Sequence, residues 1–335
     1  MTAALVEVTG VVGLAALVEP LYALLDLWSA FVFRLADATG LELLRYRFMH
    51  RAILVGLCVG VMAPLIGTFL VHRQLALIGD ALAHTAFAGV AIGLFVNAVL
   101  DVGVSPYLTA VVVAVIAALA IELISEVTDA YNDVSMAIVL STGFALGTTL
   151  ISINAGGLAV GVDQYLFGNL STVSNESAAI LLVLFALIVA TVGLTRNQLL
   201  YVTFDETAAE VSGIPVDWYN RVMVMLTALV VVGAMQIMGV ILVAAMLVVP
   251  VAAAAQVARS FTESLLASIV LAELAVLLGI GIAYYGEATA GGVIVLVAVA
   301  VYVVTVIAGK LQDRLGEGSA AEPGRIDREA TGGSD

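Results

Sequence analysis

Two ionisable residues, Asp80 and His84, lie four positions apart in the otherwise apolar stretch RQLALIGDALAHTAFAGVAIGLF, residues 73–95. On an α-helix this spacing places both side chains on one face, about 6 Å apart along the axis. A carboxylate and an imidazole can together ligate a divalent metal ion. The residue types therefore predict a cation-binding site. A hydrogen-bonded pair that only joins two helices is the alternative that the spacing leaves open.

The depth of the pair in a membrane makes it a functional candidate. If Arg73 lies at the interface, Asp80 is about 10 Å and His84 about 16 Å into the bilayer, at 1.5 Å per residue. Ionisable side chains at such depth are costly unless they face a protein interior or a wet cavity. Transporters commonly hold their substrate near this level.

The composition of the chain indicates a protein that lies in a membrane. Hydrophobic residues make up 62% of the 335 positions and charged residues only 11%, unlike the composition of soluble globular domains. The sequence predicts an all-α fold, a polytopic transmembrane helical bundle of about eight to nine spans. The nine apolar segments are 53–71, 75–96, 104–123, 134–153, 177–194, 221–235, 238–257, 264–283 and 290–309.

The chain divides into three predicted parts. Residues 1–50 form an N-terminal extension, whose apolar stretch from Val11 to Phe33 is interrupted by two acidic residues and a proline. This pattern favours a helix on the membrane surface over an additional span. Residues 51–309 form the transmembrane domain. Residues 310–335 end in a run rich in Gly, Ser, Glu and Asp, so we expect a disordered cytoplasmic tail.

Basic residues indicate which loops face the cytoplasm, because cytoplasmic loops collect Lys and Arg. If residues 195–220 lie inside, strict alternation of the spans places every basic residue after position 52 on the inner side. The arginines before that position would lie outside, and a surface helix ahead of the first span accommodates them.

Several classes of protein are excluded. The net charge of −14, with only 12 Lys and Arg residues, argues against nucleic acid as a partner. Cys58 is the single cysteine, so there is no disulfide framework and no cysteine metal site. The sequence contains no GxxxxGK[ST] motif and therefore no ATP site of its own, and it contains no HExxH motif of a zinc protease.

The longest charged interruption between predicted spans covers residues 195–221. Within it, DETAAEVSG at 205–213 predicts a short helix, with Asp205 as N-cap and Gly213 as its stop. A short helix held between two spans suits docking on a partner. An ordinary ordered loop is the alternative interpretation.

Three stretches resemble the permease subunits of the manganese, zinc and iron family of ABC transporters. RQLALIGDALAHTAFAGVAIG resembles the intramembrane GDALSH segment of that family, FDETAAEVSG its cytoplasmic coupling helix, and GVILVAAMLVVPVAAAAQVA its span with Gly and Pro. GVDQYLFGNL, residues 161–170, is a weaker match to an outer-loop segment. The matches follow the family's order between about residues 48 and 310.

The resemblance implies a multi-pass permease in the plasma membrane that works as a homodimer. It further implies two cytoplasmic ATPase subunits that dock at the coupling helices, and an extracytoplasmic metal-binding protein that delivers the metal. Asp80 and His84 would line the metal path. The residues that the resemblance assigns to coupling are Asp205, Glu206, Ala209 and Gly213.

Two residues depart from the family pattern. Ala83 replaces the usual Ser, which removes a polar partner near the ligands, and Ala88 stands where Pro is common, which removes a source of a kink. We therefore expect the pore geometry to differ while the pair of ligands is kept.

The residue types do not select a single metal. Imidazole suits zinc and iron, whereas carboxylate also accepts manganese. We expect zinc or manganese as cargo, with iron as a further candidate and zinc mildly favoured by His84, and no resident cofactor. In a homodimer the pair would be doubled across the axis, giving four ligands. A stand-alone secondary metal transporter is the alternative function.

Other polar residues have lower weight. Glu273, near the middle of its span, is a candidate second ligand or proton carrier, with a packing role as the alternative. Glu122 is expected to be interfacial, and Pro250 indicates a kinked or moving helix. Three methionines lie in or next to predicted spans, and we interpret them as core fillers and not as copper ligands. They are Met235, Met238 and Met246. The outer-loop residues that we interpret as solvated are Asp163, Asn169 and Glu176.

Overall fold

The elements of this protein are helices because, in lipid, backbone polar groups must be satisfied within the chain itself. The structure, a computed structural model, describes residues 2–100, 102–128, 132–153, 165–168 and 173–320. Within these residues every regular element is helical, which confirms the all-α fold. The elements are α1 (Thr2–Thr39), the 3-10 helix η1 (Glu42–Arg45), α2 (Arg47–His72), α3 (Ile78–Leu100), α4 (Pro106–Thr128), α5 (Asn132–Ile153), α7 (Asn175–Phe204), α8 (Glu206–Val211), α9 (Val216–Met238), α10 (Val240–Ala255), α11 (Phe261–Tyr285) and α12 (Ala290–Ala320).

Among the described residues, eight helices are long and apolar enough to cross a membrane. They are α2, α3, α4, α5, α7, α9, α11 and α12. The apolar helix α10 has 16 residues and is shorter. Each of the predicted apolar segments corresponds to one of these helices, so the prediction of about eight to nine spans is confirmed.

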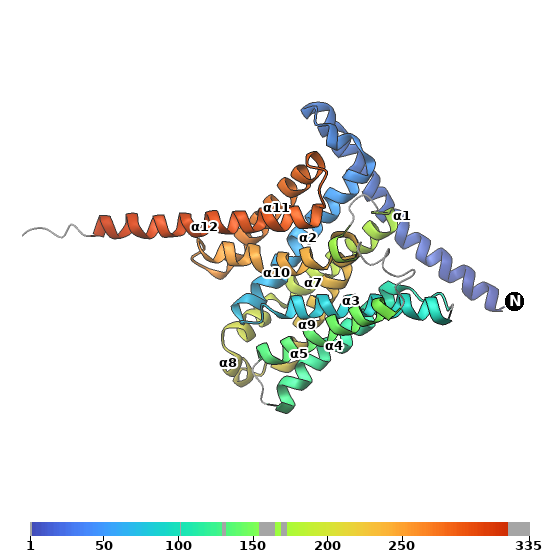
Figure 1. Cartoon of the computed structure of the whole chain (residues 1–335), viewed down its shortest axis with the longest axis horizontal. Coiled ribbons are helices and arrows are strands. Elements are labelled where there is room, and N and C mark those ends of the chain that lie inside the picture. Colours follow the sequence, from blue (N-terminus) through green and yellow to red (C-terminus); the bar gives the residue numbers. More distant parts are fainter. Residues whose placement is uncertain (1, 101, 129–131, 154–164, 169–172, 321–335) are drawn as a thin grey trace, which may run out of the picture.

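Helix α2 forms the centre of the bundle (Figure 1). It packs against α7, α9, α10 and α11, and 83% of its most apolar window is buried, compared with 22% for α5. Gly67 allows α10 to approach closely, because a Cβ atom at this position would lie 1.9 Å from the carbonyl oxygen of Leu247. Small residues are used in this way where helices meet in membranes.

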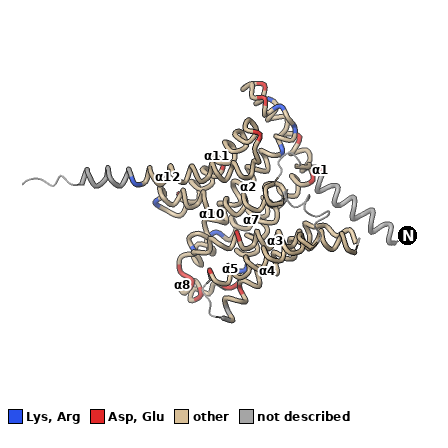
Figure 2. The backbone as a smooth tube through the Cα atoms, viewed as in Figure 1, with Lys and Arg blue, Asp and Glu red and all other residues tan. Residues whose placement is uncertain are grey.

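Most charged residues of the described chain lie towards the ends of the bundle (Figure 2). At one end, which we call the α8 end, Arg73 forms an ion pair with Glu206 of α8. At the opposite end, which we call the α1 end, Arg51 Nη1 donates a 2.9 Å hydrogen bond to Asn175 Oδ1. These contacts agree with the alternation expected from the basic residues, which places Arg73 and the segment after α7 on one side.

Helix α1 crosses α2 at the α1 end and does not run parallel to it (Figure 1). The indole Nε1 of Trp28 donates a 2.7 Å hydrogen bond to the carbonyl oxygen of His50. The ring of Phe33 meets the His50 ring edge-on, with 4.4 Å between centroids. α1 is not among the eight candidate spans found in the described residues. The location of α1 on the membrane surface stays a prediction.

We expect Trp28→Phe to loosen α1 without unfolding the bundle. The variant keeps an aromatic ring but loses the hydrogen bond to His50, which is worth about 1 kcal/mol. Limited proteolysis should then cleave the N-terminal segment faster than in the wild type. Leu27→Ala is the matched control because Leu27 is 72% exposed. Equal cleavage rates in the two variants would contradict the prediction.

Two helix ends differ from the prediction. α7 continues to Phe204, so the first ten residues of the predicted loop 195–221 are helical; this segment, TRNQLLYVTF, contains neither Gly nor Pro to stop a helix. α12 continues to Ala320, so residues 310–320 of the predicted disordered tail are helical. The remaining tail, residues 321–335, lies outside the described residues.

Pro250 does not split its helix, and the expected kink stays a prediction. α10 is helical without interruption from Val240 to Ala255, through the proline. Gly239, before α10, has a φ of 84°, and a Cβ atom there would lie 2.5 Å from the backbone nitrogen of Gly168. The chain therefore turns sharply at Gly239, and α10 continues through Pro250.

Candidate cation-binding site

The turn between α2 and α3 sets the position of Asp80. Arg73 N–H closes α2 by bonding to the Phe69 carbonyl over 3.1 Å, and Gln74 adopts a left-handed conformation with a φ of 59°. α3 begins at Ile78, three residues later than the predicted segment. Asp80 therefore lies in the first turn of α3, where the positive end of the helix dipole favours a carboxylate.

Asp80 and His84 face each other as the spacing predicts. His84 Nε2 lies 3.5 Å from Asp80 Oδ1. The His84 side chain is 23% exposed and the Asp80 side chain is 44% exposed. The His84 ring meets the Phe144 ring edge-on, with 5.2 Å between centroids. His84 Nδ1 is buried and has no hydrogen-bond partner among the described residues. The side chains of Asp80 and His84 are thus both partly exposed at the surface of the chain.

Contacts with neighbouring helices place the pair deep in the bundle. A Cβ atom at Gly79, next to Asp80, would meet the Leu247 side chain at 2.6 Å, and Leu247 lies midway along α10. A Cβ atom at Gly143 would meet Thr85, next to His84, at 2.5 Å, and Gly143 lies midway along α5. The pair is therefore level with the middles of α5 and α10.

Other potential metal ligands are few around Asp80 and His84 in the described part of the chain. Among the described residues, no group of three or more His, Cys, Asp or Glu side chains has metal-binding proximity. The structure does not bring Glu273 to the pair. Glu273 lies against α2 instead, because a Cβ atom at Gly60 would lie 2.8 Å from Glu273 Oε1. Glu273 Oε2 is buried and has no hydrogen-bond partner among the described residues. A role of Glu273 as a second ligand stays a prediction.

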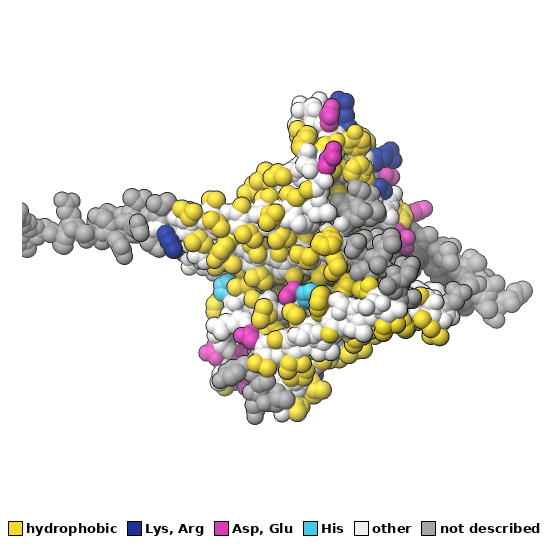
Figure 3. All heavy atoms as spheres, viewed as in Figure 1, with side chains coloured by type: hydrophobic (Ala, Val, Ile, Leu, Met, Phe, Trp, Pro, Cys, Tyr) yellow, Lys and Arg dark blue, Asp and Glu magenta, His cyan; other side chains and the backbone are white. Residues whose placement is uncertain are grey.

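The surroundings of the pair are largely apolar. Hydrophobic side chains cover most of the face shown in Figure 3, and acidic and histidine side chains interrupt it at few places. Next to His84, Phe144 is 46% exposed. Ala83 and Ala88, the two departures from the family pattern, are both buried. Ala88 packs against α5, because a Cβ at Gly147 would lie 3.3 Å from its Cα.

The predicted short helix is present as α8 at the α8 end. Asp205 caps it, because its side chain accepts a 2.9 Å hydrogen bond from Ala208 N–H. Gly213 has a φ of 80° and ends the helix: Gly213 N–H bonds to the Glu210 carbonyl and Ile214 N–H to the Ala209 carbonyl. This is the Schellman arrangement that favours glycine. The boundaries expected from the sequence are confirmed.

One face of α8 is anchored and the other is free. Ala209 is fully buried and packs with Val202 of α7 and Val216 of α9. Val211 is 87% exposed, and Glu210 is exposed as well. The helix is therefore fixed to the bundle while it presents apolar and acidic side chains outward.

We expect Asp205→Ala to fray α8 while the membrane helices stay intact. Loss of an N-cap costs about 0.5 to 2 kcal/mol of helix stability. Backbone amides of Ala208 and Ala209 should then exchange hydrogen faster, and Asp217→Ala is the control because Asp217 makes no cap for α8. Unchanged exchange at Ala208 would contradict the role of Asp205.

The structure also shows where most of the other candidate residues lie. Glu122 accepts a 3.0 Å hydrogen bond from Arg221 Nε at the α8 end, and Glu176 lies in the first turn of α7. Met235, Met238 and Met246 are buried in the hydrophobic core, as expected for core fillers. Asp163 and Asn169 lie outside the described residues.

Sequence reasoning missed the environment of the pair and the anchor of α8. Phe144 comes from a different helix, and no spacing in the sequence indicates its contact with His84. The sequence indicates only an interface position for Arg73, but in the structure Arg73 also donates a 2.6 Å hydrogen bond to Asn220 Oδ1. A lone arginine at the end of an apolar segment was the available signal.

The helices, their apolar faces and the polar pair at their centre define a multi-pass helical membrane protein. The model of the ABC 3 transport family matches residues 45–309, and the chain belongs to this family. The expected resemblance to permease subunits of ABC transporters is thereby confirmed, as is the location in the cell membrane.

Curated relatives match over most of their length. The chain is 31% identical over 264 residues to a "Probable metal transport system membrane protein" of Treponema pallidum, covering 79% of this chain and 96% of that protein. It is 32% identical over 259 residues to the "Manganese transport system membrane protein MntC" of Halalkalibacterium halodurans, covering 77% and 86%. A "Probable iron transport system membrane protein" of Haemophilus influenzae is 30% identical, covering 82% and 98%.

Solved structures share the fold. The structure titled "PsaBC from Streptococcus pneumoniae in complex with Fab" matches with a TM-score of 0.69 and 31% identity, covering 78% of this chain and 92% of that chain. A putative metal-chelate type ABC transporter in an inward-facing conformation matches with a TM-score of 0.64 and 19% identity, covering 77% and 85%. The second likeness concerns the fold alone.

Proposed function

We propose that this chain is the membrane-spanning permease of an ATP-driven importer of divalent transition-metal ions, with zinc, manganese and iron as candidate substrates. The observation that carries the proposal is the pair of Asp80 and His84, partly exposed and level with the middles of α5 and α10. Ionisable side chains at this depth are costly unless they face a protein interior or a wet cavity, and they commonly mark ion paths. The names of the relatives, which mention manganese and iron, support the class of substrate.

The pair needs further ligands, and we propose that a second copy of the chain supplies them. Two protein ligands are fewer than the three or four of stable zinc sites. Placed on a two-fold axis, the exposed sides of two pairs would face each other and provide two carboxylates and two imidazoles. This arrangement would also remove the partly exposed Asp80 carboxylate from lipid.

We propose α8 as the docking element for a cytoplasmic ATPase subunit. The sequence carries no ATP site of its own, so the energy must come from a partner or an ion gradient. α8 is anchored through Ala209 and presents Val211 outward, which suits a partner that pushes on a rigid projection. An extracytoplasmic binding protein would deliver metal at the α1 end.

Reconstitution tests the proposal against the alternative of a stand-alone secondary transporter. The chain is placed in liposomes with its ATPase subunit, its binding protein and Mn²⁺, Zn²⁺ or Fe²⁺, and uptake is followed with and without ATP. We expect uptake of at least one metal only when the ATPase and ATP are present. Metal movement by the chain alone, without ATP, would favour the secondary transporter and overturn the proposal.

A further inference from the structure

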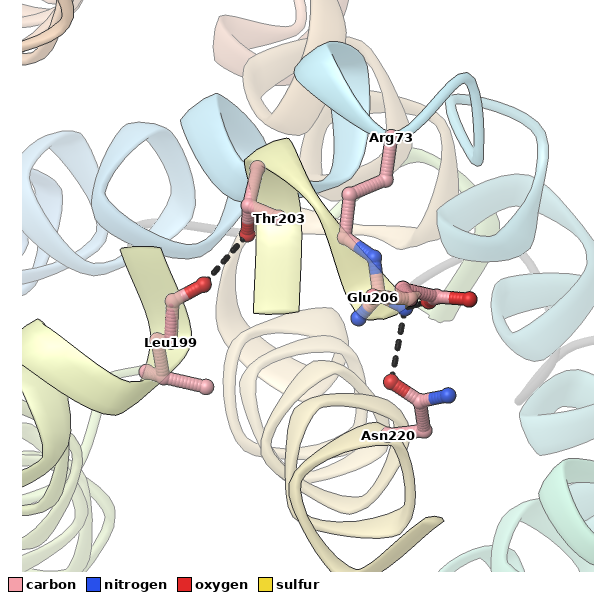
Figure 4. A network of polar contacts seen from close by, with 5 residues as sticks. All are labelled: Arg73, Leu199, Thr203, Glu206 and Asn220. Atoms are coloured by element: carbon pink, nitrogen blue, oxygen red, sulfur yellow. Dashed lines mark hydrogen bonds and ion pairs between the residues drawn. The ribbon is translucent and has the colours of Figure 1, made fainter. Parts of the chain in front are cut away.

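A single guanidinium group joins three parts of the chain at the α8 end (Figure 4). Arg73, which follows the last residue of α2, donates a 2.6 Å hydrogen bond from Nη2 to Asn220 Oδ1 of α9. The same nitrogen pairs with Glu206, the first residue of α8. The Arg73 side chain is only 8% exposed, whereas that of Glu206 is 53% exposed. Removing one acceptor from a nearly buried charge is strongly unfavourable, so the position of α8 depends on Arg73.

The residue before Arg73 contacts the other side of the start of α8. The His72 ring meets the Phe204 ring edge-on, with 6.2 Å between centroids, and Phe204 is two positions before Glu206. Phe204 also contacts Phe261 of α11, with 5.8 Å between centroids. His72 and Arg73 therefore contact Phe204 and Glu206, the residues directly before and after the N-cap of α8.

Arg73 is also the first residue of the turn that leads to α3. The turn is held to α2 by hydrogen bonds from Gln74 N–H to the Val71 carbonyl and from Leu75 N–H to the Leu70 carbonyl. Arg73, Ile78 and Glu206 line one hollow of about 330 Å³. A movement of α8 must therefore either displace this turn or break the pair of Arg73 and Glu206. Each response links the free energy of α8 to the position of the start of α3.

We propose that Arg73 is a positioning residue that couples α8 to the Asp80 end of α3. A push on α8 by the ATPase would then change the access of ions to Asp80 and His84. The proposal rests on the proposed function, because it assumes a partner that acts on α8. Only seven positions separate Arg73 from Asp80, and α3 begins directly after the turn. Arg73 itself touches no transported ion in this scheme; it acts through the turn.

The test is a comparison of metal uptake with ATP hydrolysis in liposomes that contain the full transporter. The variants are Arg73→Gln, Glu206→Gln and the double variant, and both rates are measured on the same preparation. We expect the ratio of metal transported to ATP hydrolysed to fall at least about fivefold in each single variant, the lower end of typical coupling between sites. The double variant should lose no more than a single one, because both changes remove one interaction.

Arg196→Gln is the matched control. Arg196 lies at the same end and donates a 2.9 Å hydrogen bond to Thr262 Oγ1. This bond joins α7 to α11 and does not involve α8. The ratio of metal transported to ATP hydrolysed in Arg196→Gln should equal that of the wild type. Glu206→Gln changes an exposed side chain of the same size, so the test remains decisive if Arg73→Gln fails to fold.

The outcomes are distinguishable. A wild-type ratio in Glu206→Gln, or additive losses in the double variant, would overturn the coupling role of Arg73 while the importer function stands. Parallel losses of uptake and ATP hydrolysis at a constant ratio would also overturn it, since they indicate weaker docking instead of lost coupling. If the wild-type complex shows no ATP-dependent uptake, the proposed function fails and this inference fails with it.

Discussion

Asp80→Asn and His84→Gln are each expected to reduce metal uptake by at least about 100-fold, because even the loss of a partner that only supports a metal ligand costs 10 to 100-fold. Both substitutions keep the size of the side chain. Asp80→Asn removes the carboxylate charge, and His84→Gln removes the imidazole nitrogen that lies 3.5 Å from Asp80. Uptake of Mn²⁺ and Zn²⁺ by the reconstituted transporter measures the effect.

The matched control for this prediction is Asp133→Asn. Asp133 is an exposed carboxylate in the first turn of α5, and α5 packs against α3. Asp133→Asn therefore removes the same charge as Asp80→Asn, but from a neighbouring helix. It should transport at the wild-type rate, and all three variants should keep their ATPase subunit on purification. Normal uptake by both site variants would show that the pair only joins helices.

Gly67→Ala is expected to have the largest effect on stability. A Cβ atom at Gly67 would lie 1.9 Å from the carbonyl oxygen of Leu247 and 2.8 Å from its carbonyl carbon. Both are backbone atoms, so relief requires α2 and α10 to move apart, and overpacking of this kind costs about 1 to 3 kcal/mol or more. We expect a lower melting temperature in detergent and reduced yield of folded protein.

Gly193→Ala is the control for this substitution. Gly193 lies within α7 and a Cβ atom there would meet nothing within 4 Å. Replacing an unconstrained helical glycine with alanine stabilises a helix by about 1 kcal/mol. The melting temperature should therefore stay equal or rise in Gly193→Ala. A similar decrease in both variants would refute the close approach of α2 and α10.

The amino-acid sequence alone determined the class of the protein and the location of its polar elements. Long apolar runs must become helices in a membrane, because lipid offers no partners for backbone groups. The four-residue spacing fixed the relation of Asp80 to His84, since both belong to one helix. The limits of α8 followed from Asp205 and Gly213, whose side-chain and backbone preferences act within a few residues. Local chemistry was sufficient for each of these features.

The tertiary structure alone decided which distant residues meet. Phe144 lies against His84. Glu273 lies against Gly60 and not next to Asp80 and His84. Arg73 reaches Glu206, 133 positions away in the chain. Such contacts depend on how helices pack through small residues and shape, and no spacing within one segment encodes them. Whether the pair is an ion path or a helix contact thus depends on the surfaces that surround it, which only the assembled bundle defines.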